Sequence, residues 1–414
     1  MVSSAPDGAV RPSGSRRRTW HDLGPGLLLA ATGIGVGDMV GATIAGAEYG
    51  LTLLWAVGVG VLIKYAITEG TARWQLATGV TLMEGWRDHL PRWLLGLFLI
   101  YFTVWSYVTA SAMVAASAMV PAAIIPSVPL PVWGVVHAVA ALVMVLVGRY
   151  ERFVEGMKWL IGLMFGCLLV TNVLILVNGA DWTVTGNQPD LELPYVLSLI
   201  GGVGGTVTLL SYGYWMREQG WHRPERIGSA RVDLVASFSL VGLFSLAMVF
   251  LSTQIGWEGR ILDQGPQLCL MLADRIAAET GPMGRTVFLV GFWGAAYSSV
   301  LGVWHGVPFL FDDWVHLRTR QPAAGPTGAA YRGWAVYLTL ASISALIVQR
   351  PVWIVFVYTV VGSLFFPFVI ATLLWLCNSA AMPAACRNGT PVNVALGLAL
   401  LLYVYLGVGA IPWP

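Results

Sequence analysis

The feature that most constrains this chain is a series of long apolar blocks separated by short polar connections. Each block is long enough to cross the roughly 30 Å hydrocarbon core of a bilayer as an α-helix that rises about 1.5 Å per residue. Hydrophobic residues make up 57% of the 414 positions and charged residues 11%, whereas about a quarter of a soluble domain is charged. The chain cannot build a water-soluble surface, and an all-α integral membrane protein is predicted.

The blocks predict about eleven transmembrane helices in a single membrane domain, residues 20–414, because the connections are too short to form a soluble domain. Residues 1–19 are rich in Ser, Gly, Pro and Arg and lack the apolar core of a signal peptide, so a disordered basic tail is expected. The predicted spans are Gly24–Ala45, Leu51–Gly70, Trp93–Val120, Val132–Val147, Met157–Val177, Leu193–Trp215, Val232–Ile255, Arg285–Phe311, Trp334–Val348, Val352–Leu376 and Val392–Ile411.

Positive charge is distributed unevenly between the two ends of these spans. Nineteen of the 23 Lys and Arg residues lie on the side of the N-terminal tail, and four lie on the other side. Cytoplasmic connections carry the excess of positive charge in membrane proteins. A multi-pass protein of the cell membrane is therefore expected, with the tail in the cytoplasm and, after an odd number of spans, the C-terminus outside. The net charge of +2 is the remainder of this asymmetry and gives no indication of a nucleic-acid partner.

Two of the predicted spans contain dense glycine clusters, Gly33–Asp38 in the first and Gly201–Thr208 in the sixth. Each glycine inside a helix costs about 1 kcal/mol relative to alanine, so such clusters favour unwinding. Unwound backbone in a membrane must be covered by protein or line a water-filled cavity, where its carbonyls can bind ions and polar solutes. Close helix packing is the alternative explanation for small residues, but two clusters five spans apart favour broken helices in an inverted repeat of five plus five.

Asp38 and Lys64 are the ionisable residues that stand out inside the predicted spans. A carboxylate in mid-membrane costs about 2.5–3.5 kcal/mol and usually faces a cavity or a partner. Asp38 follows the glycine run and is the candidate ligand for a cation, with a structural ion pair as the alternative. Lys64 is the partner to test, although the rise per residue places it deeper toward the cytoplasm, and its stem could instead snorkel to the inner surface.

Polar residues in the sixth and eighth spans are further candidates. Thr206 and Ser211 add hydroxyl groups that a lipid-facing helix does not need, and His305 follows a run of small and polar residues. His305 is a candidate lining or coupling residue, and a helix contact is the alternative. The four cysteines show no CxxC or metal-site spacing, and neither a nucleophile–base pair nor a GxxxxGK[ST] motif is present. The sequence predicts neither an enzyme nor a cofactor.

An ungapped run of short motifs over Gly24–Gly79 resembles one known family. The motifs are Gly24-Pro25-Gly26, Gly46, Gly50, Leu53-Leu54-Trp55, Ala72-Arg73 and Thr78-Gly79. They fall on the GPG, G, G, LLW, AR and TG positions of the Nramp family of proton-coupled divalent-metal transporters. Weaker matches at Arg152 and Glu155, Ser298-Ser299, Pro367-Phe368 and Met382 to Asn393 extend the resemblance through most of the chain. The resemblance implies eleven or twelve helices in the LeuT-type inverted-repeat fold.

The departures from the family pattern fall on its metal site. In the ungapped register the family's DPGN motif falls on Gly35–Asp38, so the metal-binding aspartate position is Gly35 and the asparagine position is Asp38. The family's alanine and methionine of the sixth helix fall on Gly202 and Gly205, and its histidine falls on Ser211. The substrate-binding residues expected from these positions are Gly35, Asp38, Gly202, Gly205, Thr206 and Ser211, with Asp38 as the metal ligand.

The altered site changes the expected substrate. Sulfur ligands help to select soft transition metals, and the resemblance places glycine where the family has methionine. A hard, partly hydrated cation such as Mg²⁺ could still bind through a carboxylate, carbonyls and hydroxyls. The expected function is secondary transport of a divalent cation by alternating access, with a substrate other than manganese or iron and with proton coupling left open. The alternative is transport of a small organic solute on the same fold.

Overall fold

The structure, a computed structural model, describes residues 24–178, 193–253, 268–319, 323–346, 357–358 and 361–409, and the regular elements in these ranges are helical. The predicted tail, residues 1–19, lies outside the described residues. The helices are α1 (Pro25–Gly33), α2 (Val36–Tyr49), α3 (Leu54–Thr78), α4 (Leu82–His89), α5 (Arg92–Ile124), α6 (Leu130–Val147), α7 (Tyr150–Val177), α8 (Leu193–Gly202), α9 (Ser211–Glu218), α10 (Ile227–Thr253), α11 (Leu268–Thr319), α12 (Ala329–Ala345), α14 (Phe365–Leu376) and α15 (Thr390–Gly409).

Each of the eleven predicted spans overlaps a helix or a pair of half-helices, and residues 254–255, 347–348, 352–356, 359–360 and 410–411 of these spans lie outside the described residues. The first span is divided into α1 and α2, and the sixth is divided into α8 and α9, with the short 3-10 helix η3 (Val207–Leu210) between them. Within the described ranges, seven helices are long and apolar enough to cross a membrane. The two broken spans are made of shorter helices because their glycine clusters interrupt the helical hydrogen bonds.

The predicted span Arg285–Phe311 corresponds to the part of α11 that follows a kink at Gly281. α11 as a whole begins at Leu268, so a helical segment that the sequence did not predict precedes this span. Asp274 and Arg275 make the first part of α11 too polar for a hydropathy-based span. This part joins the apolar part across Gly281, whose φ of 74° is left-handed and interrupts the helical geometry.

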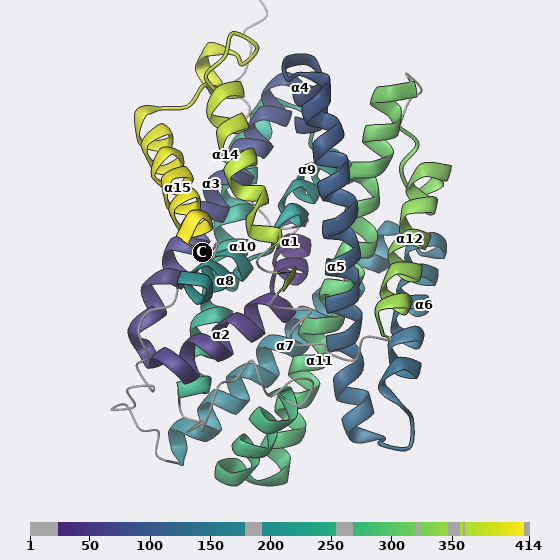
Figure 1. The fold of residues 1–414 in the computed structure, drawn as a ribbon, viewed down its shortest axis with the longest axis vertical. Coiled ribbons are helices and arrows are strands. Elements are labelled where there is room, and N and C mark those ends of the chain that lie inside the picture. Colours follow the sequence, from purple (N-terminus) through teal and green to yellow (C-terminus); the bar gives the residue numbers. More distant parts are fainter. Residues whose placement is uncertain are drawn as a thin grey trace, which may run out of the picture.

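The two broken helices lie inside the bundle. Figure 1 shows the short helices α1 and α9 at its centre, with α5, α6 and α12 on one side and α14 and α15 on the other. α1 packs against α7, α9, α10 and α11, and every residue of α1 except Leu27 is buried. The unwound backbone is therefore covered by protein, as a membrane-spanning chain requires.

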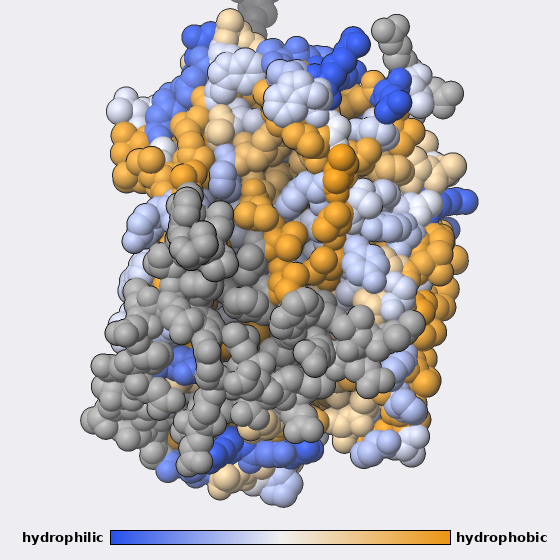
Figure 2. Space-filling view, viewed as in Figure 1, coloured by the Kyte–Doolittle hydropathy of each residue, from blue (hydrophilic) through white to orange (hydrophobic). Residues whose placement is uncertain are grey.

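The outer surface of the bundle is apolar where it would meet lipid. Large side chains such as Leu62, Leu169 and Leu401 are 67%, 66% and 67% exposed, respectively. In Figure 2, hydrophobic residues lie in the upper middle and along the right edge of the visible face, among residues of intermediate hydropathy, and most strongly hydrophilic residues gather at the top and bottom. This distribution is that of a multi-pass membrane protein, in which exposed apolar side chains contact lipid tails.

Candidate functional site

The first helix break is closed off by α11. The break between α1 and α2 leaves main-chain carbonyls without helical partners. Ser298 Oγ donates a hydrogen bond to the carbonyl of Ala31 at 2.8 Å, and Ser299 Oγ donates one to the carbonyl of Thr32 at 3.0 Å. Two adjacent serines of α11 therefore stabilise the end of α1 at the break.

The second helix break lies directly against the first. Gly204 and Gly205 adopt φ angles of 74° and 87°, which are left-handed conformations that favour glycine. A Cβ atom on Gly33 of α1 would lie 2.7 Å from the carbonyl oxygen of Gly204, so the two backbones meet without intervening side chains. The glycine clusters predicted to unwind both do so, and they meet at one place in the bundle.

Asp38 lies in the first turn of α2 with 1% of its surface exposed. Its Oδ2 accepts a hydrogen bond from the Gly204 N–H at 3.2 Å, and its Oδ1 accepts one from Ser245 Oγ of α10 at 3.0 Å. The N-terminus of α2 also favours a negative charge at this position. Because a carboxylate has about four acceptor positions, these two hydrogen bonds leave it able to bind a cation.

Lys64 of α3 is fully buried and reaches the second break. Its Nζ donates hydrogen bonds to the carbonyls of Gly201 at 3.0 Å, Val203 at 2.8 Å and Gly205 at 2.6 Å. The same nitrogen lies 4.3 Å from the centroid of the Phe366 ring. The snorkelling alternative is wrong, because the carbonyls released by the broken sixth helix supply all three acceptors that an ammonium group needs.

One peptide group connects the two buried charges. Lys64 binds the carbonyl oxygen of Val203, and Asp38 binds the N–H of Gly204, which belongs to the same peptide unit. The ammonium and the carboxylate therefore lie on opposite ends of a single peptide dipole, and each end of that dipole faces the opposite charge. This indirect arrangement replaces the direct ion pair that the sequence left open.

The structure gives the other predicted site residues different surroundings. Thr206 accepts a hydrogen bond from Trp105 Nε1 at 3.0 Å and therefore faces α5. Ser211 is buried against α11, where a Cβ on Gly306 would lie 2.7 Å from it. The carbonyl of Gly202 accepts a hydrogen bond from the Gly205 N–H at 3.3 Å and closes the turn after α8.

Gly35 has no room for a side chain, because a Cβ there would collide with Ser299 Oγ. Ser299 therefore occupies the space that an aspartate at this family position would need. His305 lies apart from the pair of charges, in an aromatic cluster. Its ring stacks on Phe153 at 4.1 Å between centroids, and its Nδ1 accepts a hydrogen bond from Trp215 Nε1 at 3.1 Å.

The atoms near the two breaks that could serve as metal ligands are oxygen atoms. Among the residues that the structure describes, no three His, Cys, Asp or Glu side chains come together to hold a metal ion. A cation bound beside Asp38 would therefore be held by one carboxylate together with main-chain and hydroxyl oxygens and water. This donor set suits hard cations such as Mg²⁺, which retain part of their hydration shell.

The polar residues on one face of α10 were not among the predicted site residues. Ser237 Oγ donates to the carbonyl of Gly26 at 2.7 Å, and Asp233 Oδ2 accepts from the Gly26 N–H at 2.7 Å. Asp233, Ser237 and Ser245 follow one another at intervals of four and then eight positions, so they lie along one side of the helix. This spacing of polar residues in an otherwise apolar span could have identified the face of α10 that contacts α1 and α2.

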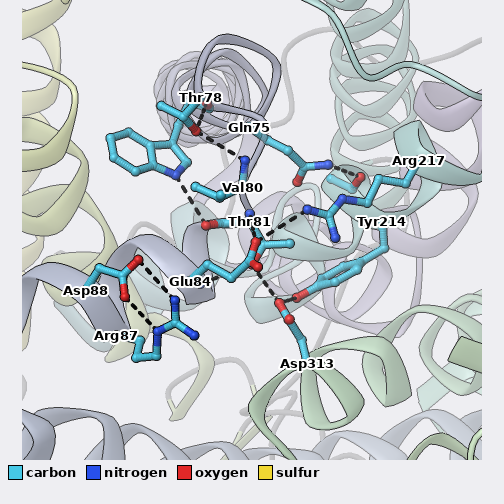
Figure 3. A network of polar contacts seen from close by, with 12 residues as sticks. Gln75, Thr78, Val80, Thr81, Glu84, Arg87, Asp88, Tyr214, Arg217 and Asp313 are labelled. Carbon is cyan, nitrogen blue, oxygen red and sulfur yellow. Dashed lines mark hydrogen bonds and ion pairs between the residues drawn. The ribbon is translucent and has the colours of Figure 1, made fainter. Parts of the chain in front are cut away.

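A second polar network holds α9 at one end of the bundle (Figure 3). Asp313 Oδ2 of α11 accepts hydrogen bonds from Thr81 Oγ1 and from Tyr214 Oη, both at 2.7 Å. Glu84 of α4 forms a capping box with Thr81 and lies 3.5 Å from Arg217. The network ties the half-helix α9 to α4 and α11.

The fold and the two facing helix breaks define a multi-pass membrane protein of the LeuT type. The sequence profile described as natural resistance-associated macrophage protein-like, or Nramp, matches residues 26–411. The chain belongs to the Nramp family, as the motif resemblance predicted.

Comparison with individual proteins agrees with this assignment. The chain is 26% identical over 297 residues to an uncharacterized protein of Pasteurella multocida, with 65% of each chain covered. It is 23% identical over 305 residues to the divalent metal cation transporter MntH of Deinococcus radiodurans, covering 70% of this chain and 68% of that protein. The matched region thus spans about two thirds of the length of either relative.

Solved structures show the fold. A manganese transporter of Eremococcus coleocola superposes with a TM-score of 0.77 at 17% identity, covering 96% of this chain and 88% of that chain. MhsT in complex with L-phenylalanine superposes with a TM-score of 0.59 at 15% identity, covering 93% and 98%. The predicted LeuT-type architecture with broken helices 1 and 6 is confirmed.

Proposed function

We propose that this chain is a secondary transporter that moves a divalent cation across the cell membrane by alternating access, with Asp38 as its carboxylate ligand. The observation that carries the proposal is the position of Asp38. Its carboxylate is buried where the two broken helices meet, at the N-terminus of α2 and beside the N–H of Gly204. The names of two relatives, a divalent metal cation transporter and a manganese transporter, support the same class of substrate.

The substrate we propose is a hard cation rather than manganese or iron. Glycine stands at residues 202 and 205, where the family places its alanine and methionine, so the thioether that favours soft metals is absent from that position. The Lys64 ammonium also offsets the charge of Asp38 and weakens the attraction for a fully dehydrated ion. Mg²⁺ retains several water molecules when it binds proteins, so it tolerates a site with one carboxylate.

A small organic solute is the second candidate. The observation that supports it is the arrangement of charges at the helix breaks. Asp38 and Lys64 present opposite buried charges separated by one peptide group. Broken helices in transporters of this fold can bind polar and charged groups of organic substrates. A solute with a basic group would match the Asp38 carboxylate, whereas the N–H bonds of Lys64 are already taken by three carbonyls.

Uptake into proteoliposomes distinguishes the two candidates. Wild-type protein is compared with Asp38→Asn for uptake of Mg²⁺ and Mn²⁺, with a pH-sensitive dye inside the vesicles to report proton movement. Asp88→Asn serves as the control, because Asp88 is exposed and pairs with the neighbouring Arg87. We expect Mg²⁺ uptake to fall at least about tenfold in Asp38→Asn, since an interaction with a charged group contributes about 1.5–3 kcal/mol.

Other outcomes of this experiment are equally informative. Normal uptake by folded Asp38→Asn protein would remove Asp38 from the site. Absence of uptake of either ion by folded wild-type protein would contradict cation transport and favour the organic solute. A higher rate for Mn²⁺ than for Mg²⁺ would contradict the proposed preference for a hard cation.

A further inference from the structure

Lys64 has a complete set of partners around its ammonium group. Three main-chain carbonyls, those of Gly201, Val203 and Gly205, accept its three N–H bonds at 2.6–3.0 Å. The face of the Phe366 ring lies 4.3 Å from the same nitrogen, within the range of a cation–π interaction. The side chain of Lys64 is fully buried.

The partners of Lys64 are unusual for a buried lysine, because its hydrogen bonds go to the main chain. A structural ion pair would place Nζ on a carboxylate oxygen. Instead, both carboxylate oxygens of Asp38 bind other donors, the Gly204 N–H and Ser245 Oγ. The Lys64 ammonium therefore binds a cluster of main-chain carbonyls rather than a carboxylate.

Carbonyl clusters of this kind bind small cations in membrane proteins. Carbonyl oxygens can replace the hydration shell of a monovalent ion, and the unwound carbonyls of broken helices coordinate coupling ions in transporters. In this chain the cluster is built by two consecutive left-handed glycines, Gly204 and Gly205, which follow α8. The only charged atom that the structure places among these three oxygens, within the described residues, is Lys64 Nζ.

We propose that the carbonyls of Gly201, Val203 and Gly205 form a monovalent-cation site that the chain fills with its own Lys64 ammonium. The lysine is a tethered cation that keeps the broken sixth helix in its unwound form. The consequence for transport rests on the proposed function: a cation permanently attached at this place makes transport independent of free Na⁺ or K⁺ there.

The test uses two substitutions that both remove the charge. Lys64→Ala removes the charge and the stem, which leaves space for a free cation among the carbonyls. Lys64→Met removes the charge but keeps a stem of similar length, so the space stays filled. The full-length proteins are purified in detergent, and their thermal unfolding is measured in equal concentrations of NaCl, KCl, methylammonium chloride and choline chloride.

We expect a small cation to raise the unfolding temperature of Lys64→Ala and of no other variant. Lys64→Ala should unfold about 2–4 °C higher in at least one of the three small cations than in choline. Lys64→Met should show no such difference, and neither should wild-type protein. Lys158→Ala is the matched control, because Lys158 is the other lysine of the chain and is exposed on α7.

Several results would overturn the proposal. They are equal unfolding temperatures of Lys64→Ala in all four salts, the same rescue in Lys64→Met, or stabilisation of wild-type protein by a small cation over choline. Failure of Lys64→Ala to fold even with methylammonium present would also overturn it, because the free cation should then have replaced the ammonium. The readout involves no transport, so a failure of the proposed transport function leaves this test unaffected.

Discussion

At the scale of single residues, the peptide group between Val203 and Gly204 explains how two opposite charges are buried together. An isolated charge in a membrane is costly, and a hydrogen bond to a charged group contributes about 1.5–3 kcal/mol. The Val203 carbonyl binds Lys64 and the Gly204 N–H binds Asp38. These main-chain groups are free to do so because the helix is broken. The break and the two charges therefore stabilise each other.

The conformation of Gly204 gives a prediction about stability. Its φ of 74° is left-handed, and a Cβ there would lie 3.2 Å from Phe238. Gly204→Ala should lower the free energy of unfolding by about 1–2 kcal/mol because alanine rarely adopts this conformation. Thermal unfolding in detergent measures the loss.

Gly58→Ala is the control for this substitution. Gly58 lies within α3, and a Cβ there would meet no atom within 4 Å. Alanine is the better helix former, so this variant should be at least as stable as wild type. Equal loss of stability in Gly58→Ala and Gly204→Ala would show that the left-handed conformation is not the cause.

At the scale of elements, composition and glycine clusters were sufficient to predict most of the fold. Eleven spans and two broken helices followed from apolar length and from glycine density, because lipid restricts the chain to helices. The position of the unwound backbone was predictable as well, since Gly33–Asp38 and Gly201–Thr208 contain the observed breaks. Apolar length and glycine density are local properties, so they can be recognised in a single sequence.

The partners of the predicted site residues were not predictable in the same way. Lys64 binds carbonyls 137 to 141 positions away, and main-chain acceptors leave no mark in the sequence. Ser245 is a single small polar residue in an apolar helix, and its contact with Asp38 depends on how α2 packs against α10. His305 was a candidate lining residue because it follows small and polar residues in its span, yet it packs among aromatic rings. Long-range packing therefore decides which polar residue lies at the helix breaks.

The network around α9 gives a prediction at this scale. Thr81 and Tyr214 donate to the same oxygen of Asp313. Thr81→Val and Tyr214→Phe should each lower the free energy of unfolding by about 1 kcal/mol. The double variant should lose an amount that differs from the sum by at least about 0.5 kcal/mol, because the two donors share one acceptor.

Thermal or denaturant unfolding of the four proteins measures this coupling. Thr286→Val is the control, because Thr286 is exposed and bonds within its own helix. Strict additivity of the two substitutions would show that Thr81 and Tyr214 do not act on α9 through Asp313.

At the scale of the whole molecule, one carboxylate joins the two half-helices that would have to move. Asp233 Oδ2 of α10 accepts hydrogen bonds from the Gly26 N–H of α1 at 2.7 Å and from Tyr212 Oη of α9 at 3.0 Å. Further polar contacts hold α1 to α11 and α9 to α4. The contacts of Asp233 hold the start of α1 and the half-helix α9 against α10, and the alternating access proposed above would require them to break.

The last prediction concerns the opening of the bundle at these contacts. Asp233→Ala should favour the open state, because it removes the acceptor shared by α1 and α9, and a loss of about 1 kcal/mol changes the population of two states about fivefold. Ser211→Cys, placed in a protein without its four native cysteines, reports the opening, since Ser211 of α9 is fully buried while these contacts are in place. Its reaction with a water-soluble maleimide in membranes should become about fivefold faster. Thr109→Cys, at an equally buried position of α5, distinguishes this opening from general loosening. An unchanged rate at residue 211, or an equal increase at residue 109, would show that Asp233 does not control the opening.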